Sequence, residues 1–308
     1  MSGAPEIFDT RLLEERRRRL LRQMANGRVG NEPPPDFLLD HALQDVRDRL
    51  SLIKRSFSKA LVVGDYGRRV ARALVADGVP MVNVIDVAEG FVDDQELGCD
   101  RAIEAIGGGT DTLAVADEAY DLAVALLSLQ YANDLPGVLR QIEKALKPDG
   151  LFIGVLLGGA TLMELRRVML QTEAEMSGGA APRVLPFVDV RDAGALLQRA
   201  GFALPVTDAE SVTVSYANAL DLMRELKAMG ATNVLVDRSR RPMTRGVLLR
   251  AAELYGEEFP ADDGARRIRA TFELITMTGW SPDPSQQKPL KPGSGKVSLA
   301  DVLKPRSQ

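Results

Sequence analysis

The residues best suited to chemistry include two glycines and two acids placed at the ends of short apolar runs. Gly64, Asp65 and Gly67 follow one such run, and Asp86 ends the next. Glycines in a turn let the backbone approach a ligand, and the N–H groups of a following helix can bind its anionic or polar end. An acid at the tip of the neighbouring strand can accept hydrogen bonds from ribose hydroxyls. These residues predict a nucleotide-type cofactor site, with a plain strand-to-helix turn as the alternative.

A second polar group follows the apolar run 121–127. Its members are Ser128, Gln130, Tyr131, Asn133 and Asp134. In an open α/β sheet the loops at the carboxyl ends of the strands line the ligand crevice, which makes these residues pocket candidates. Asn133 and Asp134 could equally cap the helix that follows.

The elements that must position these residues alternate along the chain. Apolar runs typical of strands lie at 60–63, 82–85, 121–127 and 151–157. The stretch 204–216 has strand character, especially at Val212-Thr213-Val214, and 268–278 alternates between apolar and polar residues as a strand does. Amphipathic stretches between them predict helices. This alternation predicts one α/β domain of roughly 250 residues. The runs 212–216 and 268–278 predict an antiparallel pair at a sheet edge, interrupted by a helical insertion near 217–257.

The two ends of the chain differ from this pattern. We expect a helical arm over 1–54, the main domain over 55–280 and a flexible tail over 281–308, which is rich in Pro, Gly, Ser and Lys. The arm contains the run Arg16–Arg19 and an apolar stripe of leucines. It could contact an acidic protein or nucleic acid, or pack over the domain through its leucines, and we favour packing.

Composition narrows the class of function. A net charge of −4 makes nucleic acid an unlikely partner, and a single cysteine, Cys99, with a single histidine, His41, predicts no thiolate or histidine metal site. No apolar run is long enough to span a membrane. The charged N-terminus has no apolar signal core, so we expect a cytoplasmic protein.

The order of these pieces resembles a class I S-adenosylmethionine-dependent methyltransferase. The resemblance rests on the turn at Gly64, on Asp86, on the strand led by Asp121 and on the turn Lys147-Pro148-Asp149-Gly150. It implies a Rossmann-like sheet of seven mostly parallel strands, helices on both faces and an antiparallel last strand. It also implies that the glycine turn holds the methionine end of the cofactor, Asp86 the ribose and Asp111 the adenine, and we count Ser128 as a further cofactor contact.

Two longer blocks resemble one family within this class. Ser128-Leu129-Gln130-Tyr131-Ala132-Asn133-Asp134-Leu135-Pro136 is similar to the family's Ser-Leu-His-Trp-Val-Asn-Asp-Leu-Pro, and Gly158-Gly159-Ala160-Thr161-Leu162-Met163-Glu164-Leu165-Arg166 to its Gly-Gly-Asp-Thr-Leu-Tyr-Glu-Leu-Arg. The family is that of the NADH dehydrogenase (complex I) assembly factor 5 and its bacterial relatives. It implies a protein partner, such as a respiratory-complex subunit, and its mitochondrial member hydroxylates an arginine.

The sequence departs from the family pattern at the cofactor loop. Val62 stands where the family has an acid, Tyr66 and Arg68 replace two glycines, and Gln130-Tyr131 replaces His-Trp. Three functions therefore stay open. The chain could be a methyltransferase with Ser128, Gln130 and Tyr131 near the reacting group, an inactive scaffold or chaperone with the same fold, or an arginine hydroxylase.

Overall fold

The computed structural model describes residues 6–25, 37–64, 67–85, 102–106, 108–262 and 266–287. Most of the tail expected over 281–308 lies outside the described residues, as do Asp65 and Asp86. Within the described part, no helix combines the length and the apolarity needed to cross a membrane.

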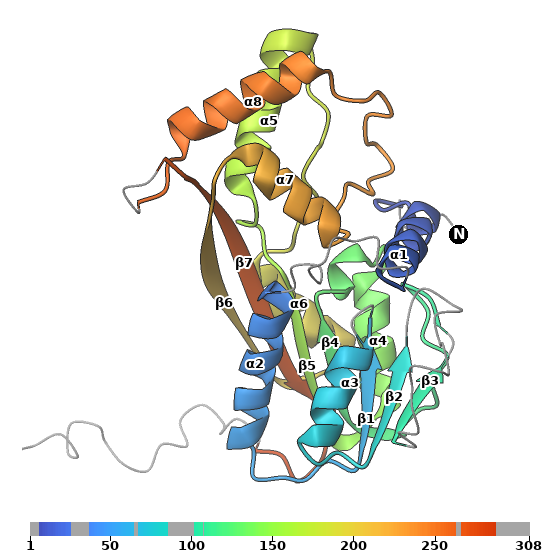
Figure 1. The fold of residues 1–308 in the computed structure, drawn as a ribbon. Coiled ribbons are helices and arrows are strands. Elements are labelled where there is room, and N and C mark those ends of the chain that lie inside the picture. Colours follow the sequence, from blue (N-terminus) through green and yellow to red (C-terminus); the bar gives the residue numbers. More distant parts are fainter. Residues whose placement is uncertain are drawn as a thin grey trace, which may run out of the picture.

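A mixed sheet forms the centre of the fold (Figure 1). Its strands are β1 (Lys59–Val63), β2 (Met81–Ile85), β3 (Ile103–Ile106), β4 (Tyr120–Leu126), β5 (Leu146–Leu157), β6 (Ala203–Tyr216) and β7 (Ile268–Trp280). They form a seven-stranded sheet in the order β3-β2-β1-β4-β5-β7-β6. β7 runs antiparallel to both β5 and β6, and the remaining pairs are parallel. The predicted fold class and the antiparallel pair at the sheet edge are therefore confirmed.

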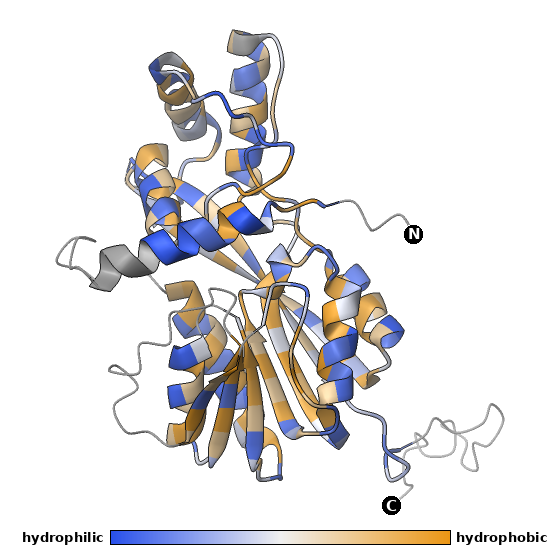
Figure 2. Ribbon diagram, turned by 90° about the vertical axis from the view of Figure 1, so that its right-hand side faces the viewer, coloured by the Kyte–Doolittle hydropathy of each residue, from blue (hydrophilic) through white to orange (hydrophobic). Residues whose placement is uncertain are grey.

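Helices cover both faces of the sheet (Figure 1). α2 (Phe37–Leu52) and α3 (Gly67–Ala76) lie on one face, and α4 (Leu135–Ala145) and α6 (Val190–Ala200) on the other. A parallel sheet enclosed in this way must be apolar on both faces. Every residue of β4 is buried, and the central strands are coloured mainly as hydrophobic in Figure 2.

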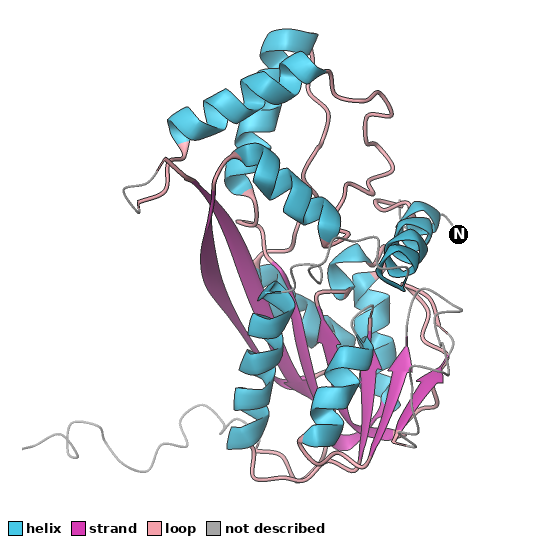
Figure 3. Cartoon of the chain, viewed as in Figure 1, coloured by secondary structure: helices cyan, strands magenta, loops and turns pink. Residues whose placement is uncertain are grey.

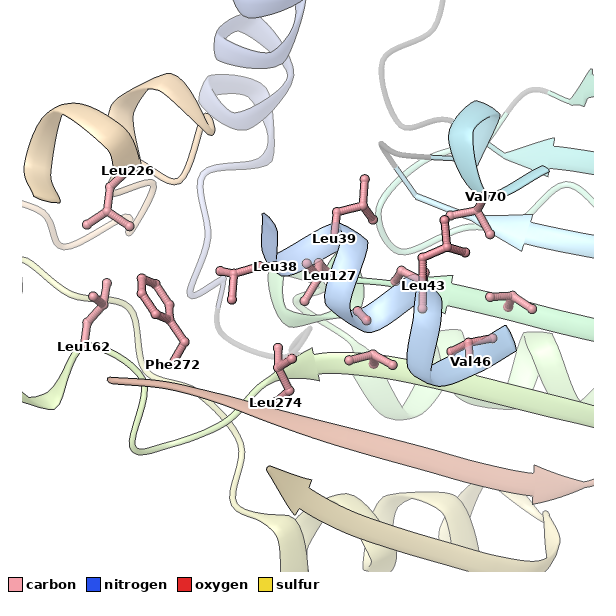
Figure 4. Packing of buried hydrophobic residues seen from close by; sticks show 14 of the residues in the cluster. Leu38, Leu39, Leu43, Val46, Val70, Leu127, Leu162, Leu226, Phe272 and Leu274 are labelled. Atoms are coloured by element: carbon pink, nitrogen blue, oxygen red, sulfur yellow. The ribbon is translucent and has the colours of Figure 1, made fainter. Parts of the chain in front are cut away.

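The face under α2 holds the larger hydrophobic cluster. Figure 4 shows Leu38, Leu43 and Val46 of α2 packed towards Val70 of α3 and Leu274 of β7. α2 is thus part of the same core as the sheet. The boundary that separates an arm over 1–54 from the main domain stays a prediction.

Three helices form an outer lobe beyond the carboxyl ends of the parallel strands (Figure 3). They are α5 (Met163–Ser177), α7 (Ala219–Ala228) and α8 (Arg245–Glu258). α5 follows β5, and α7 and α8 are inserted between β6 and β7, which explains why all three lie at the same end of the sheet. α1 (Thr10–Ala25) lies between this lobe and the tips of the strands (Figure 1).

Candidate functional site at the carboxyl ends of the strands

The loops that follow β1 and β4 meet at Gly64 and Ser128. The Ser128 hydroxyl donates a hydrogen bond of 3.0 Å to the Val63 carbonyl oxygen. Gly64 has φ +121°, and a Cβ placed on it would lie 2.3 Å from both Cβ and Oγ of Ser128. Only glycine fits this junction, because any side chain would be both strained and displaced by Ser128. The structure therefore brings together two residues that the sequence predicted separately.

Gly67 begins α3 directly beside this junction. Its N–H donates to the Gly64 carbonyl oxygen at 3.0 Å, and a Cβ on Gly67 would lie 2.3 Å from Cγ1 of Val84 in β2. The start of α3 is consequently pressed against the sheet. The first N–H groups of a helix have no acceptor within the helix and carry a partial positive charge, which favours an anionic or polar group at this end of the sheet.

Gln130 places a polar atom inside the same loop. Its Nε2 donates to the Leu127 carbonyl oxygen at 2.7 Å. Its Oε1 is buried and has no hydrogen-bond partner among the described residues. A buried acceptor without a partner costs free energy, which makes this atom a candidate ligand contact.

Tyr131 lies beneath the N-terminal segment. Its ring meets the Phe8 ring edge to face at 6.2 Å, and the Arg17 guanidinium lies 5.2 Å from the ring centroid. Leu13 and Leu235 belong to the same hydrophobic cluster. α1 therefore packs over the domain through apolar residues, as the favoured interpretation of the arm expected. The catalytic role predicted for Tyr131 stays a prediction.

The two candidate capping residues behave differently. Asp134 caps α4, because its Oδ1 accepts a 3.0 Å hydrogen bond from the N–H of Gly137. Asn133 makes no such bond and instead contacts the backbone of Ile7 and Phe8. The capping interpretation is correct for Asp134 and wrong for Asn133, and no local pattern in the sequence indicates a partner 125 residues away.

Asp111 lies beside this loop. Its Oδ1 accepts a 2.9 Å hydrogen bond from the N–H of Asp134, and its carbonyl oxygen accepts one of 3.0 Å from Gln141. The structure therefore places Asp111 next to the polar residues that follow β4. Asp65 and Asp86 lie outside the described residues, and the cofactor roles of all three acids stay predictions.

A cavity of about 640 Å³ opens near the end of β5. It is lined by Glu6, Ile7, Gly159, Arg166, Pro182, Val184, Pro186, Phe187, Leu235 and Asp237. Glu6 and Asp237 are exposed, whereas the Arg166 guanidinium donates to the carbonyl oxygens of Gly159 and Leu185 at 3.2 and 3.3 Å. No pattern in the sequence indicates this cavity, because its walls come from distant parts of the chain. The described residues contain no group of three or more His, Cys, Asp or Glu side chains that could hold a metal ion.

Comparison with known proteins identifies methyltransferase-type relatives. A family model described as a methyltransferase domain matches residues 63–154. The mitochondrial arginine-hydroxylase NDUFAF5 of Danio rerio is 37% identical over 269 residues, which cover 87% of this chain and 83% of the relative. The protein of the same name from Mus musculus is 35% identical and covers 98% of this chain and 88% of its own.

More distant matches carry the same fold. A malonyl-[acyl-carrier protein] O-methyltransferase of Methylovorus is 31% identical over 84% of this chain and 83% of its own. The crystal structure of the YcgJ protein from Bacillus subtilis superposes with a TM-score of 0.54 at 15% identity, over 79% of this chain and 99% of its own. At that identity the superposition supports the fold alone.

The comparisons correct one expectation. The cytoplasmic location inferred from the charged N-terminus is contradicted, because the relatives from Danio rerio, Mus musculus and Homo sapiens are named as mitochondrial proteins. These names point to mitochondria instead.

Proposed function

The chain belongs to the family of the arginine-hydroxylase NDUFAF5, within the class I S-adenosylmethionine-dependent methyltransferases, and from this premise we propose that it binds S-adenosylmethionine and acts on an arginine side chain of a protein partner. The observation that carries the proposal is the junction of Gly64 and Ser128, followed two residues later by Gln130, whose buried Oε1 has no partner among the described residues. In open α/β sheets ligands bind outside the carboxyl ends of the strands, where this junction lies.

The described residues of the turn support cofactor binding. Gly64 and Gly67 keep side chains away from the turn, and the N-terminus of α3 supplies N–H donors for the methionine end. By family resemblance Asp65 completes this turn, Asp86 accepts from the ribose, and Asp111 lies near the adenine. When bound, the cofactor supplies an electrophilic methyl group.

The cavity near the end of β5 supports a cationic side chain as substrate. Two exposed acids, Glu6 and Asp237, and one cation, Arg166, line the cavity, so the acids outnumber the cation and would favour a guanidinium. Pro186 and Phe187 provide apolar walls along the aliphatic stem of such a side chain. The cavity adjoins the loop after β4, because Ile7 is bonded to Asn133 and Leu235 packs in the cluster that contains Tyr131. The chain would accelerate the reaction mainly by positioning the guanidinium and excluding water.

We further propose a second candidate reaction and a class of protein partner. The name of the mitochondrial relatives favours hydroxylation of the arginine as a second candidate reaction. Family resemblance further supports a subunit of respiratory complex I as the protein partner. A scaffold that keeps the fold but has lost the cofactor is the third alternative, and it predicts no cofactor binding.

Mass spectrometry of a partner protein distinguishes these functions. Purified protein is incubated with a candidate subunit and either S-adenosylmethionine or dioxygen with a two-electron reductant, because hydroxylation takes one oxygen atom from dioxygen and releases the other as water. The subunit is then sequenced by fragmentation. A mass gain of one methylene group on an arginine supports methyl transfer, and a gain of one oxygen supports hydroxylation. An unmodified subunit that still binds the chain supports the scaffold.

A further inference from the structure

In the segment Glu6–Asp9, called the strap below, three backbone groups are bonded to one side chain from the loop after β4. The Oδ1 of Asn133 accepts hydrogen bonds of 2.8 Å from the N–H groups of both Ile7 and Phe8, and its Nδ2 donates one of 3.0 Å to the Phe8 carbonyl oxygen. One amide group thus satisfies three backbone groups of a segment far away in the sequence. An asparagine suits this position because it offers an acceptor and a donor together.

The other edge of the strap pairs with the segment that follows α7. The N–H of Asp9 donates to the Val234 carbonyl oxygen at 2.8 Å, and the N–H of Val236 donates to the Ile7 carbonyl oxygen at 2.9 Å. Asp9 also forms an ion pair of 3.1 Å with Arg238. The strap therefore lies between Asn133 on one side and the segment 234–236 on the other, where Phe8 forms an isolated antiparallel bridge with Leu235.

The strap forms part of the wall of the cavity near β5. Glu6 and Ile7 line it directly, and Leu235 and Asp237 line it from the segment paired with the strap. The loop that carries Asn133 begins at Ser128, which contacts Gly64 at the cofactor end. One loop of the chain therefore touches both ends of the site.

We propose that Asn133 is a positioning residue that couples the cofactor end of the site to the substrate cavity. It fixes the strap as a wall of the substrate cavity. Cofactor binding at Gly64 and Ser128 orders the strap through the same loop. This inference rests on the proposed function, because it assumes a cofactor at that junction. It assigns Asn133 no contact with the reacting atoms. Coupling of this kind requires that both sites bias one structural element, here the loop 128–133.

Hydrogen–deuterium exchange of the full chain tests the proposal. Exchange is followed in the peptide that covers residues 6–13, with and without S-adenosylhomocysteine, in the wild-type protein and in Asn133→Ala. We expect the ligand to slow exchange of the strap in the wild type. In Asn133→Ala we expect exchange at Ile7 and Phe8 to be faster by on the order of tenfold or more, since three hydrogen bonds are lost, and the slowing by ligand to disappear.

Two further variants separate coupling from general loss of stability. Asn133→Asp keeps the acceptor for the N–H groups of Ile7 and Phe8 but loses the donor, so its exchange should lie between those of the wild type and Asn133→Ala. Thr244→Ala removes the hydrogen bond that caps α8 in the outer lobe and should leave strap exchange and its response to ligand unchanged.

The outcomes for the proposed function and for the coupling are distinct. If calorimetric titration detects no binding of S-adenosylhomocysteine to the wild type, the proposed function fails. If the ligand binds but strap exchange is the same with and without it, or if Asn133→Ala exchanges like the wild type, the coupling through Asn133 is refuted while the proposed function stands.

Discussion

Ser128 occupies the space that a side chain at position 64 would need. A Cβ on Gly64 would stand 2.3 Å from Ser128 Cβ, and the Gly64 backbone already has φ +121°. The loops after β1 and β4 are thereby held at one point, and Ser128 Oγ completes the contact by donating to Val63. The position of the cofactor turn thus depends on the loop that carries the polar candidates.

Replacing Gly64 by alanine should damage both folding and ligand binding. Gly78 offers a matched control, because it has φ +97° and nothing lies within 4 Å of its added Cβ. Gly78→Ala should cost about 1–3 kcal/mol in the free energy of unfolding from backbone strain alone. Gly64→Ala should cost at least about 1 kcal/mol more, because Ser128 must move. Urea denaturation measures both values, and equal costs would show that the contact with Ser128 is unimportant.

Gln130→Met tests whether the unpartnered Oε1 serves a ligand. The variant leaves the Leu127 carbonyl oxygen without its hydrogen bond, which costs about 1–3 kcal/mol, but it also removes a buried acceptor that has no described partner. The two effects should partly cancel, so the net loss of stability should stay within about 1 kcal/mol. Turnover of the arginine substrate should fall by roughly tenfold. Stability is measured by urea denaturation and turnover by mass spectrometry.

Gln141→Met is the control for that variant. The Oε1 of Gln141 accepts a 2.8 Å hydrogen bond from Leu113, so its removal leaves a backbone donor unpaired and should cost about 1–3 kcal/mol of stability while turnover persists. The reverse pattern, with Gln130→Met unstable and fully active, would argue that Gln130 has only a structural role.

Tyr131 should matter to stability chiefly through its ring. Tyr131→Ala removes the partner of Phe8 and Arg17 and should lower the free energy of unfolding by about 3–5 kcal/mol. Tyr131→Phe keeps the ring and should stay within about 1 kcal/mol of the wild type. Loss of turnover in the stable Phe variant would assign the hydroxyl a role at the reacting group. A Tyr131→Ala variant as stable as the wild type would contradict the packing described for the arm.

Asp121 should make stability depend on pH in the acid range. Burial alone would raise the pKa of its carboxyl, but hydrogen bonds from Ser58 and Lys59 outweigh this and leave the pKa below its usual value. The charged form is therefore favoured in the folded state. Its contribution is complete above the unfolded pKa, near 4, and is lost as the pH falls through the lower folded pKa.

Urea denaturation between neutral and strongly acid pH tests this dependence. Asp121→Asn should be less stable than the wild type at neutral pH, and the difference should shrink as the pH falls below about 4. Asp262→Asn serves as control, because that side chain is 94% exposed and should alter stability little at any pH. A constant difference across the range would show that the charge of Asp121 is irrelevant to folding.

The sequence predicted the central strands because they are short apolar runs separated by amphipathic stretches. Those patterns can be seen in the local sequence. They arise because a strand covered by helices on both faces must be apolar throughout, as the fully buried β4 is. The sequence predicted Gly64 and Ser128 as candidates but not their contact, which depends on the pairing of β1 with β4. The role of Asn133 was not predicted either, because its partners Ile7 and Phe8 are supplied by a separate segment whose position depends on tertiary packing. The cavity was missed for the same reason.

The measurement that tests the central claim most directly is calorimetric titration of the purified chain with S-adenosylhomocysteine. The account predicts saturable binding in the micromolar range, with one ligand per chain. It also predicts that Gly64→Ala binds far more weakly while Gly78→Ala binds as the wild type does. No binding at millimolar ligand, or equal binding by the wild type and Gly64→Ala, would contradict a cofactor site at the tips of β1 and β4.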